Sequence, residues 1–65
     1  PLSTPMNELP KIGAPATQAL TGAGYHKLAD LVGAKRGELE HLHGVGPKAL
    51  RILDQALEEH GHKLT

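Results

Sequence analysis

Two glycines that bracket a single valine, directly ahead of a helix, are the residues whose types and spacing most clearly indicate chemistry. Glycine permits positive φ and leaves its N–H unshielded, so we expect both Gly44 and Gly46 to turn the backbone in this way, with Val45 pointing inward as an anchor. The open N–H groups would lie at a helix N-terminus, where the helix dipole is equivalent to about half a positive charge. This arrangement predicts a binding site for an anion such as a phosphate.

The charges of the helix that follows support an anion site. Lys48 and Arg51 stand near its N-terminal end and Glu58 and Glu59 near its C-terminal end. The helix dipole favours the reverse order by roughly 0.3–1 kcal/mol per charge, so a bound phosphate would explain the placement. The alternative is structural: Arg51 pairs with Asp54 or Glu58, and Lys48 is a solvated surface residue.

Other reactive side chains do not form a recognisable set. The histidine pairs His41/His43 and His60/His62 have a spacing of two, which does not place both rings on one helical face, and the chain has no Cys. We therefore expect no metal site, and expect His43 to approach a phosphate instead. Ser3 has no nearby base and the seven carboxylates are dispersed, so we expect no enzyme activity.

The elements that position these residues read as helices. Pro at the first helical position and Gly61 at the far end predict a helix from 47 to about 60, with its apolar residues on one arc. Shorter helices, each followed by a glycine or a turn, are predicted over 14–23, 26–32 and 35–42, and residues 9–12 stay undecided between turn and helix. Apolar residues do not alternate as in a strand, so the predicted class is all-α, with four to five short helices.

Helices shorter than about 12–15 residues are marginal in water, so the short ones must dock on the long one. Lys35 and Arg36 precede Glu38 and Glu40 in a short helix, a pattern typical of a solvated face, although either cation could extend a phosphate-binding surface. The predicted core consists of Leu9, Ile12, Leu20, Leu28, Leu31, Val32, Leu39, Leu42, Val45, Leu50, Leu53 and Leu57.

Composition and charge exclude some classes of protein. The chain has 65 residues with seven basic and seven acidic side chains, and the absence of Cys excludes a disulfide scaffold. Zero net charge argues against a strongly basic nucleic-acid binder unless the charges are unevenly placed. We expect residues 1–7, which carry two Pro and no apolar period, to be a poorly ordered arm before one domain over 8–65. No apolar run approaches the length of a membrane span, and the N-terminus lacks the basic start and apolar stretch of a signal peptide. We therefore expect a cytoplasmic protein.

The sequence also contains an internal repeat. A shift of 33 positions aligns Leu9 with Leu42, Gly13 with Gly46 and Leu20 with Leu53, so each copy reads as an apolar segment, a Gly and then a helix. Such similarity is typical of one supersecondary unit that is used twice. Lys11 stands where the second copy has Gly44, which predicts a different turn in the first copy.

Residues 39–53 closely resemble the helix-hairpin-helix motif: apolar, two residues, apolar, one residue, Gly, apolar, Gly, then a Pro-Lys-Ala helix start. With the degenerate copy over 9–20, residues from about 8 to 62 resemble a tandem helix-hairpin-helix domain. They are also similar in order and spacing to the C-terminal domain of the bacterial RNA polymerase α subunit. The resemblance implies a compact, SAM-like bundle built from two helix-hairpin-helix units.

The resemblance also implies a partner, double-stranded DNA, gripped by its phosphate backbone from the minor groove side, with the second copy on one strand and the first copy on the other. Pro15 stands where the polymerase domain has an Arg that enters the minor groove, so we expect binding to be largely independent of sequence. Some family members serve instead in protein–protein interaction or dimerisation, which the neutral charge would suit. The expected DNA-contacting residues are His43, Gly44, Val45, Gly46, Pro47, Lys48, Arg51, Lys11, Gly13 and Thr17.

Some members of the family hold a monovalent cation at the hairpin carbonyls when DNA is bound. By position, those carbonyls would belong to Glu40, Leu42 and Val45. No other cofactor is expected.

Overall fold

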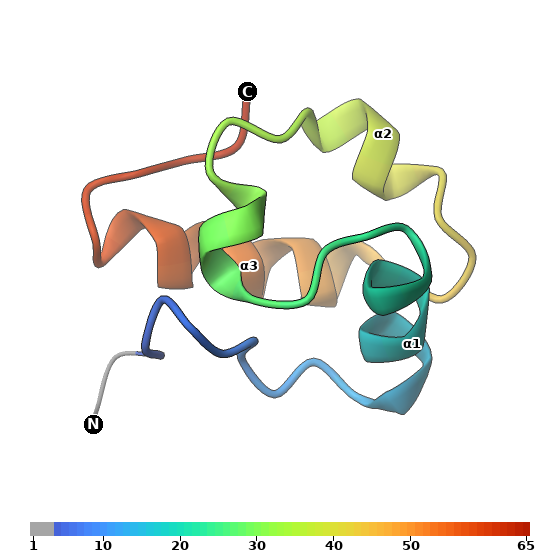
Figure 1. Ribbon diagram of the computed structural model, residues 1–65. Helices are drawn as coiled ribbons and strands as arrows, with labels where there is room; N and C mark the ends of the chain where they lie inside the picture. Colours follow the sequence, from blue (N-terminus) through green and yellow to red (C-terminus); the bar gives the residue numbers. More distant parts are fainter. Residues whose placement is uncertain (1–3) are drawn as a thin grey trace.

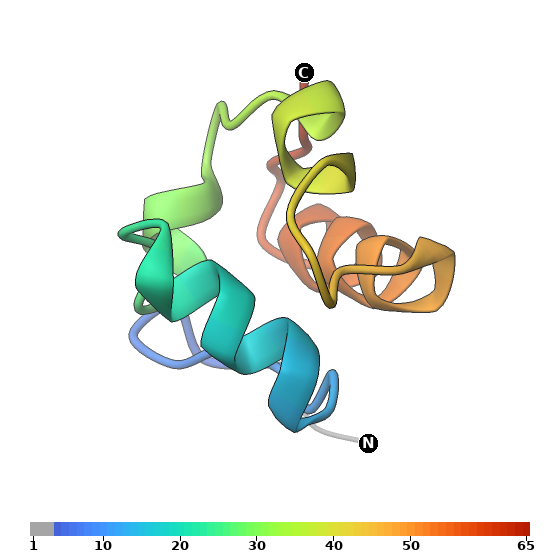
Figure 2. The same cartoon turned by 90° about the vertical axis from the view of Figure 1, so that its right-hand side faces the viewer.

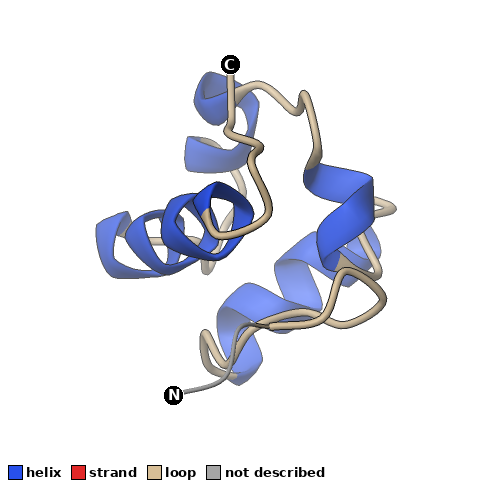
Figure 3. Ribbon diagram, turned by 90° about the vertical axis from the view of Figure 1, so that its left-hand side faces the viewer, coloured by secondary structure: helices blue, strands red, loops and turns tan. Residues whose placement is uncertain are grey.

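The computed structural model describes residues 4–65, and every regular element within that range is helical (Figure 3). The elements are α1 (Ala14–Gly22), a 3₁₀ helix η1 (Leu28–Leu31), α2 (Arg36–Glu40) and α3 (Pro47–Glu58). The predicted all-α class is confirmed. Residues 9–12 are not helical, and the helix predicted over 26–32 is a single 3₁₀ turn.

Helix α3 forms where the sequence predicts it. Pro47 occupies its first position after Gly46, which suits the fixed φ of proline and its missing N–H. The helix ends at Glu58, two residues before the predicted end, and Gly61 has φ +79° while the His62 N–H donates to the Leu57 carbonyl at 2.9 Å. This is the bond pattern of a Schellman C-terminus, which satisfies a carbonyl that the helix itself leaves free.

Helix α3 crosses the middle of the molecule, and the other elements surround it (Figure 1). Both η1 and α2 pack against it. Helix α1 lies toward its N-terminal end in the view of Figure 1, and the segment between α2 and α3 passes α1 on its way to the start of α3 (Figures 1 and 2). The N-terminal part of α3 is thus the region in which the two repeat copies meet.

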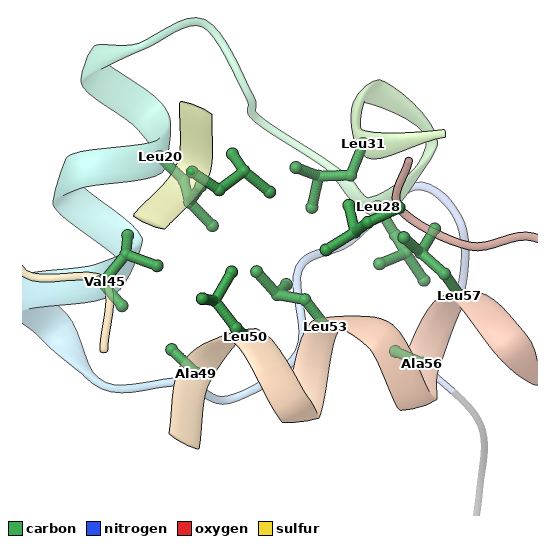
Figure 4. Packing of buried hydrophobic residues seen from close by; sticks show 12 residues of the cluster. Leu20, Leu28, Leu31, Val45, Ala49, Leu50, Leu53, Ala56 and Leu57 are labelled. Atoms are coloured by element: carbon green, nitrogen blue, oxygen red, sulfur yellow. The ribbon is translucent and has the colours of Figure 1, made fainter. Parts of the chain in front are cut away.

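The core lies between one face of α3 and the leucines of the shorter elements. In Figure 4, Leu50 and Leu53 point from α3 toward Leu20 of α1 and the leucines of η1. Eight of the twelve predicted core residues are buried, and Leu9, Ile12 and Leu42 pack at the edge of the core rather than inside it. The buried apolar residues are Ala16, Leu20, Leu28, Leu31, Leu39, Val45, Ala49, Leu50, Leu53, Ala56, Leu57 and Leu64.

Val32 is not part of the core, contrary to the prediction, because it is 41% exposed. A 3₁₀ helix has three residues per turn, so Leu28 and Leu31 share the inward face while the residue four positions after Leu28 does not. Val32 itself has an extended backbone, φ −63° and ψ 120°, directly after η1.

The segment predicted as a poorly ordered arm packs on the domain over the part that the structure describes. His60 Nε2 hydrogen-bonds the Thr4 carbonyl at 2.7 Å, and the Ala29 N–H donates to the Met6 carbonyl at 2.9 Å. Met6 also packs against the core. Backbone carbonyls in residues 4–7 thus bond to η1 and to the residue two positions after α3, and residues 1–3 of the expected arm lie outside the described range.

The C-terminal residues close the other side of the core. Leu64 is 8% exposed, and Thr65 makes two backbone hydrogen bonds at the start of α2. Its N–H donates to the Ala34 carbonyl at 2.9 Å, and its carbonyl accepts from the N–H of Arg36, the first residue of α2, at 3.0 Å. These bonds fix the tail, which lets one leucine outside any helix contribute to the core.

Candidate nucleic-acid interface

The two helices of the internal repeat begin at equivalent positions. Gly13 and Gly46, 33 residues apart in the sequence, are the N-cap residues of α1 and α3. Each accepts the first helical hydrogen bond at its carbonyl, from the Thr17 N–H at 3.0 Å and from the Leu50 N–H at 3.1 Å. The aligned glycines of the sequence repeat thus both cap a helix, although their backbone angles differ.

The loop before α3, residues 42–46 and called the second loop below, closes as the sequence predicts at two of its positions. Gly44 has φ +101°, and Val45 is 7% exposed, which confirms it as the inward anchor. The Val45 N–H donates to the Leu42 carbonyl at 3.1 Å. Gly46, however, has φ −100° and ψ 179°, so the predicted positive φ is wrong there: this N-cap residue has the extended backbone that is typical of such positions, and the positive φ of the loop occurs at Gly44.

The second loop and the start of α3 leave donors open. Among the described residues, no hydrogen-bond acceptor is found for the N–H groups of Gly44, Gly46, Lys48 or Ala49. The first turn of α3 has neither a side-chain cap nor an acidic residue, and its last turn has no basic residue. These N–H groups are therefore available to an external anion at the positive end of the helix dipole.

The loop before α1, residues 9–13 and called the first loop below, has a different conformation, as the sequence predicts. Its positive φ occurs at Gly13, at +92°, whereas Gly46 at the equivalent position has a negative φ. Lys11 stands where the second loop has Gly44, and every residue with positive φ in the described range is a glycine. The first loop thus offers an ammonium group at the position where the second loop offers an unshielded N–H.

The two repeat copies share one shallow surface depression of about 280 Å³. Lys11 comes to it from the first loop and Lys48 from the first turn of α3, and both lysines are exposed. We call this feature the two-lysine depression. Acidic side chains do not line it, so the charged groups that line it are the two ammonium groups. Its lining residues are Lys11, Ile12, Gly13, Lys48, Ala49 and Ile52.

Arg51 belongs to a separate hollow, between α2 and α3, and not to the two-lysine depression. This hollow has a volume of about 570 Å³ and carries charges of both signs. Its Asp54 forms an ion pair with Arg36, and among the described residues Arg51 forms an ion pair with neither Asp54 nor Glu58. The hollow is lined by Arg36, Glu40, Val45, Pro47, Leu50, Arg51 and Asp54.

The remaining predicted residues lie around the two loops. His43 is exposed beside Gly44, and Pro47 is exposed at the start of α3. Thr17 is half-buried, and its backbone carbonyl accepts the Thr21 hydroxyl at 2.7 Å. The structure thus brings Lys48 together with Lys11 and Gly13 at one depression, and places Thr17 one helical turn into α1.

One contact in this region was missed by sequence reasoning. A Cβ atom built on Gly44 would lie 2.7 Å from the backbone oxygen and 3.0 Å from the carbonyl carbon of Pro15, in the first turn of α1. Gly44 is therefore a glycine for two reasons, its positive φ and its close approach to α1. A contact between chain segments this far apart has no signature in a single sequence.

The described residues contain no group of three or more His, Asp or Glu side chains able to hold a metal ion. Of the carbonyls considered for a monovalent cation, those of Glu40, Leu42 and Val45, that of Leu42 accepts the Val45 N–H. Within residues 4–65, helices long and apolar enough to cross a lipid bilayer are absent. Comparisons of the chain with models of known protein families, with curated proteins and with solved structures found no match.

Proposed function

We propose that this chain is a non-catalytic DNA-binding module of the helix-hairpin-helix kind, which holds the phosphate backbone of a duplex from the minor groove side. The observation that carries the proposal is the two-lysine depression, which Lys11 of the first copy and Lys48 of the second copy both line and which no acidic residue lines. The open N–H groups of the second loop lie at the same helix start as Lys48. Ammonium and N–H donors at adjacent positions are the groups that bind phosphate oxygens.

The chemistry of these groups favours binding that is largely independent of base sequence. Backbone N–H groups and lysines recognise phosphates, whereas sequence is read by side chains that reach base edges. A few phosphate contacts correspond to non-specific affinity, with Kd on the order of 10⁻⁴ to 10⁻⁶ M at physiological salt. The zero net charge of the chain is compatible with this mode, because two of the cations are gathered at one surface.

Two helix-hairpin-helix units are the architecture that we propose for this surface. The equivalent caps at Gly13 and Gly46 support two units, and the differing φ values of the two loops support one regular and one altered hairpin. In this arrangement the second loop binds one strand through backbone N–H groups, and the first loop binds the other strand through Lys11.

The test is a titration of a fluorescently labelled duplex, followed by anisotropy at two salt concentrations. Lys48→Glu and Lys11→Glu should each weaken binding at low salt and lower the slope of log K against log salt by about 1 or more. Lys63→Glu is the matched control, because it makes the same charge change at an exposed lysine that lines a different hollow. An equal loss of duplex affinity in all three variants would mean that the effect comes from net charge alone and not from the two-lysine depression. Unchanged affinity in Lys11→Glu and Lys48→Glu would contradict the proposal.

A protein-interaction role is the second candidate, and the hollow between α2 and α3 favours it. Arg51 and Glu40 face that hollow alongside Leu50, so it combines opposite charges with apolar surface, as interface rims and cores do. Sedimentation equilibrium of the wild-type chain and of Arg51→Glu would reveal self-association through this hollow. A monomer at all concentrations, combined with duplex binding that depends on Lys48, would leave DNA binding as the better account.

A further inference from the structure

We infer that the contact between Gly44 and Pro15 is a positioning contact, which holds the two loops at a fixed separation so that Lys11 and Lys48 engage one duplex together. The inference rests on the proposed function and adds to it the role of one residue pair in holding the two lysines in register. The inference starts from the close packing of Gly44 against α1: a Cβ added to Gly44 would lie 2.7 Å from the Pro15 backbone oxygen. Packing this close leaves no room for relative movement of the two segments toward each other.

The two partners of this contact belong to the two repeat copies. Pro15 lies in the first turn of α1, close to the cap residue Gly13, whose own added Cβ would be 3.9 Å from the Pro15 Cδ. Gly44 lies in the second loop, which the Val45 N–H closes through its bond to the Leu42 carbonyl. Each side of the contact is thus held within its own copy, and the contact joins the copies beside both sets of donors.

The position of the contact determines what would move if it were broken. The atoms that crowd Gly44 most closely are backbone atoms of α1, which cannot rotate aside as a side-chain tip can. A methyl group on Gly44 would therefore displace the second loop from α1. Lys48 would move away from Lys11, and the two lysines could no longer both contact phosphates of one duplex in their best geometry. Two binding groups on one rigid body bind more tightly than the same groups on bodies that must be brought into register.

The experiment compares Gly44→Ala with Gly24→Ala in the duplex titration at several salt concentrations. Gly24 has φ +96°, close to the +101° of Gly44, but nothing lies within 4 Å of its added Cβ, so this control carries the backbone strain without the contact. Far-UV circular dichroism gives the folded fraction, and each Kd is corrected for it. If Gly44→Ala is not fully folded, all titrations are repeated in trimethylamine N-oxide, which favours the folded state.

We expect Gly44→Ala to bind the duplex about tenfold more weakly than Gly24→Ala, with a salt slope smaller by about 0.9 for each phosphate that the variant no longer neutralises. Equal affinity and equal slope for the two variants would overturn the inference, as would a weaker affinity with an unchanged slope. Lys48→Glu separates this failure from that of the proposed function, since it leaves the contact between Gly44 and Pro15 intact. If Lys48→Glu does not weaken binding, the proposed function fails first and the inference fails with it.

Discussion

Arg36 and Asp54 form an ion pair that joins α2 to α3 across a separation of 18 residues in the sequence. Their side chains are 42% and 32% exposed, so water screens the pair. The pairing gives α2, a helix of only five residues, a polar attachment in addition to the buried Leu39. It also occupies Arg36, one of the two cations considered as an extension of a phosphate-binding surface, whereas Lys35 remains an exposed candidate.

Asp54→Asn should lower the free energy of unfolding by roughly 0.2–1 kcal/mol, because the pair is half-exposed and such pairs contribute little. The loss should shrink as salt is raised, since screening weakens the wild-type pair. Urea denaturation of both proteins at low and high salt measures it. Glu58→Gln, an exposed carboxylate on the same helix, is the control. A loss above about 2 kcal/mol would mean that Asp54 does more than pair with Arg36.

Leu64→Ala should destabilise the fold by about 2 kcal/mol, because it removes a buried side chain from the core. That is a large share of the roughly 3–5 kcal/mol that one core of this size supplies. Val32→Ala is the matched comparison and should change stability by no more than about 0.5 kcal/mol, since Val32 is 41% exposed. Thermal and urea unfolding followed by circular dichroism would rank the two. The reverse ranking would contradict the packing described for the C-terminal tail.

Gly44→Ala should lower stability more than Gly24→Ala does. Both substitutions place alanine at a φ near +100°, which costs roughly 1–2 kcal/mol, but only at position 44 does the new methyl meet backbone atoms. Overpacking of this kind costs a further 1–3 kcal/mol or so. Equal midpoints in urea would show that the second loop moves away from Pro15 without cost.

Gly46→Ser should leave the fold as stable as wild type or more stable by a few tenths of a kcal/mol, because serine is a better N-cap than glycine. The backbone there has φ −100°, and an added Cβ has open space around it. The new hydroxyl would accept a hydrogen bond from the N–H of Lys48 or Ala49, which are the groups proposed to face DNA. Duplex affinity should therefore fall while stability does not, and anisotropy titration beside urea denaturation tests both. Unchanged affinity would mean that these N–H groups do not contact the duplex.

The start of α3 and its buried face follow from the sequence because they depend on local signals. Pro47 and Gly46 mark the start, and the apolar spacing of 3.6 residues marks the face. Sequence signals fail to predict burial where the local residue pattern differs from the tertiary packing. Val32 fits an α-helical face, but the element formed there is a 3₁₀ turn, and Leu64 carries no periodic signal because it lies alone in the tail.

The candidate site was predictable as a set of residues but not as an arrangement. Lys11 and Lys48 can each be identified from the repeat, yet their meeting on one depression depends on how α1 and α3 pack. Because of the same packing, Arg51, only three residues after Lys48, lines the hollow between α2 and α3 instead. Sequence spacing places both cations near one helix end, and only the positions of the neighbouring helices decide which surface each one faces.

The unequal φ values of the two loops have a consequence for how a duplex would lie on this surface. An exact two-fold pair of loops would hold a duplex equally well in two opposite directions. Here the positive φ falls at Gly44 in one copy and at Gly13 in the other, and Lys11 replaces the first glycine. The two strands would therefore meet different donors, so the two opposite orientations of the domain on DNA become distinguishable. They keep equal energies, because phosphate contacts alone do not distinguish the two strands of a duplex. A duplex with distinguishable ends, such as a hairpin with a dye at its open end, should therefore show the two orientations equally populated.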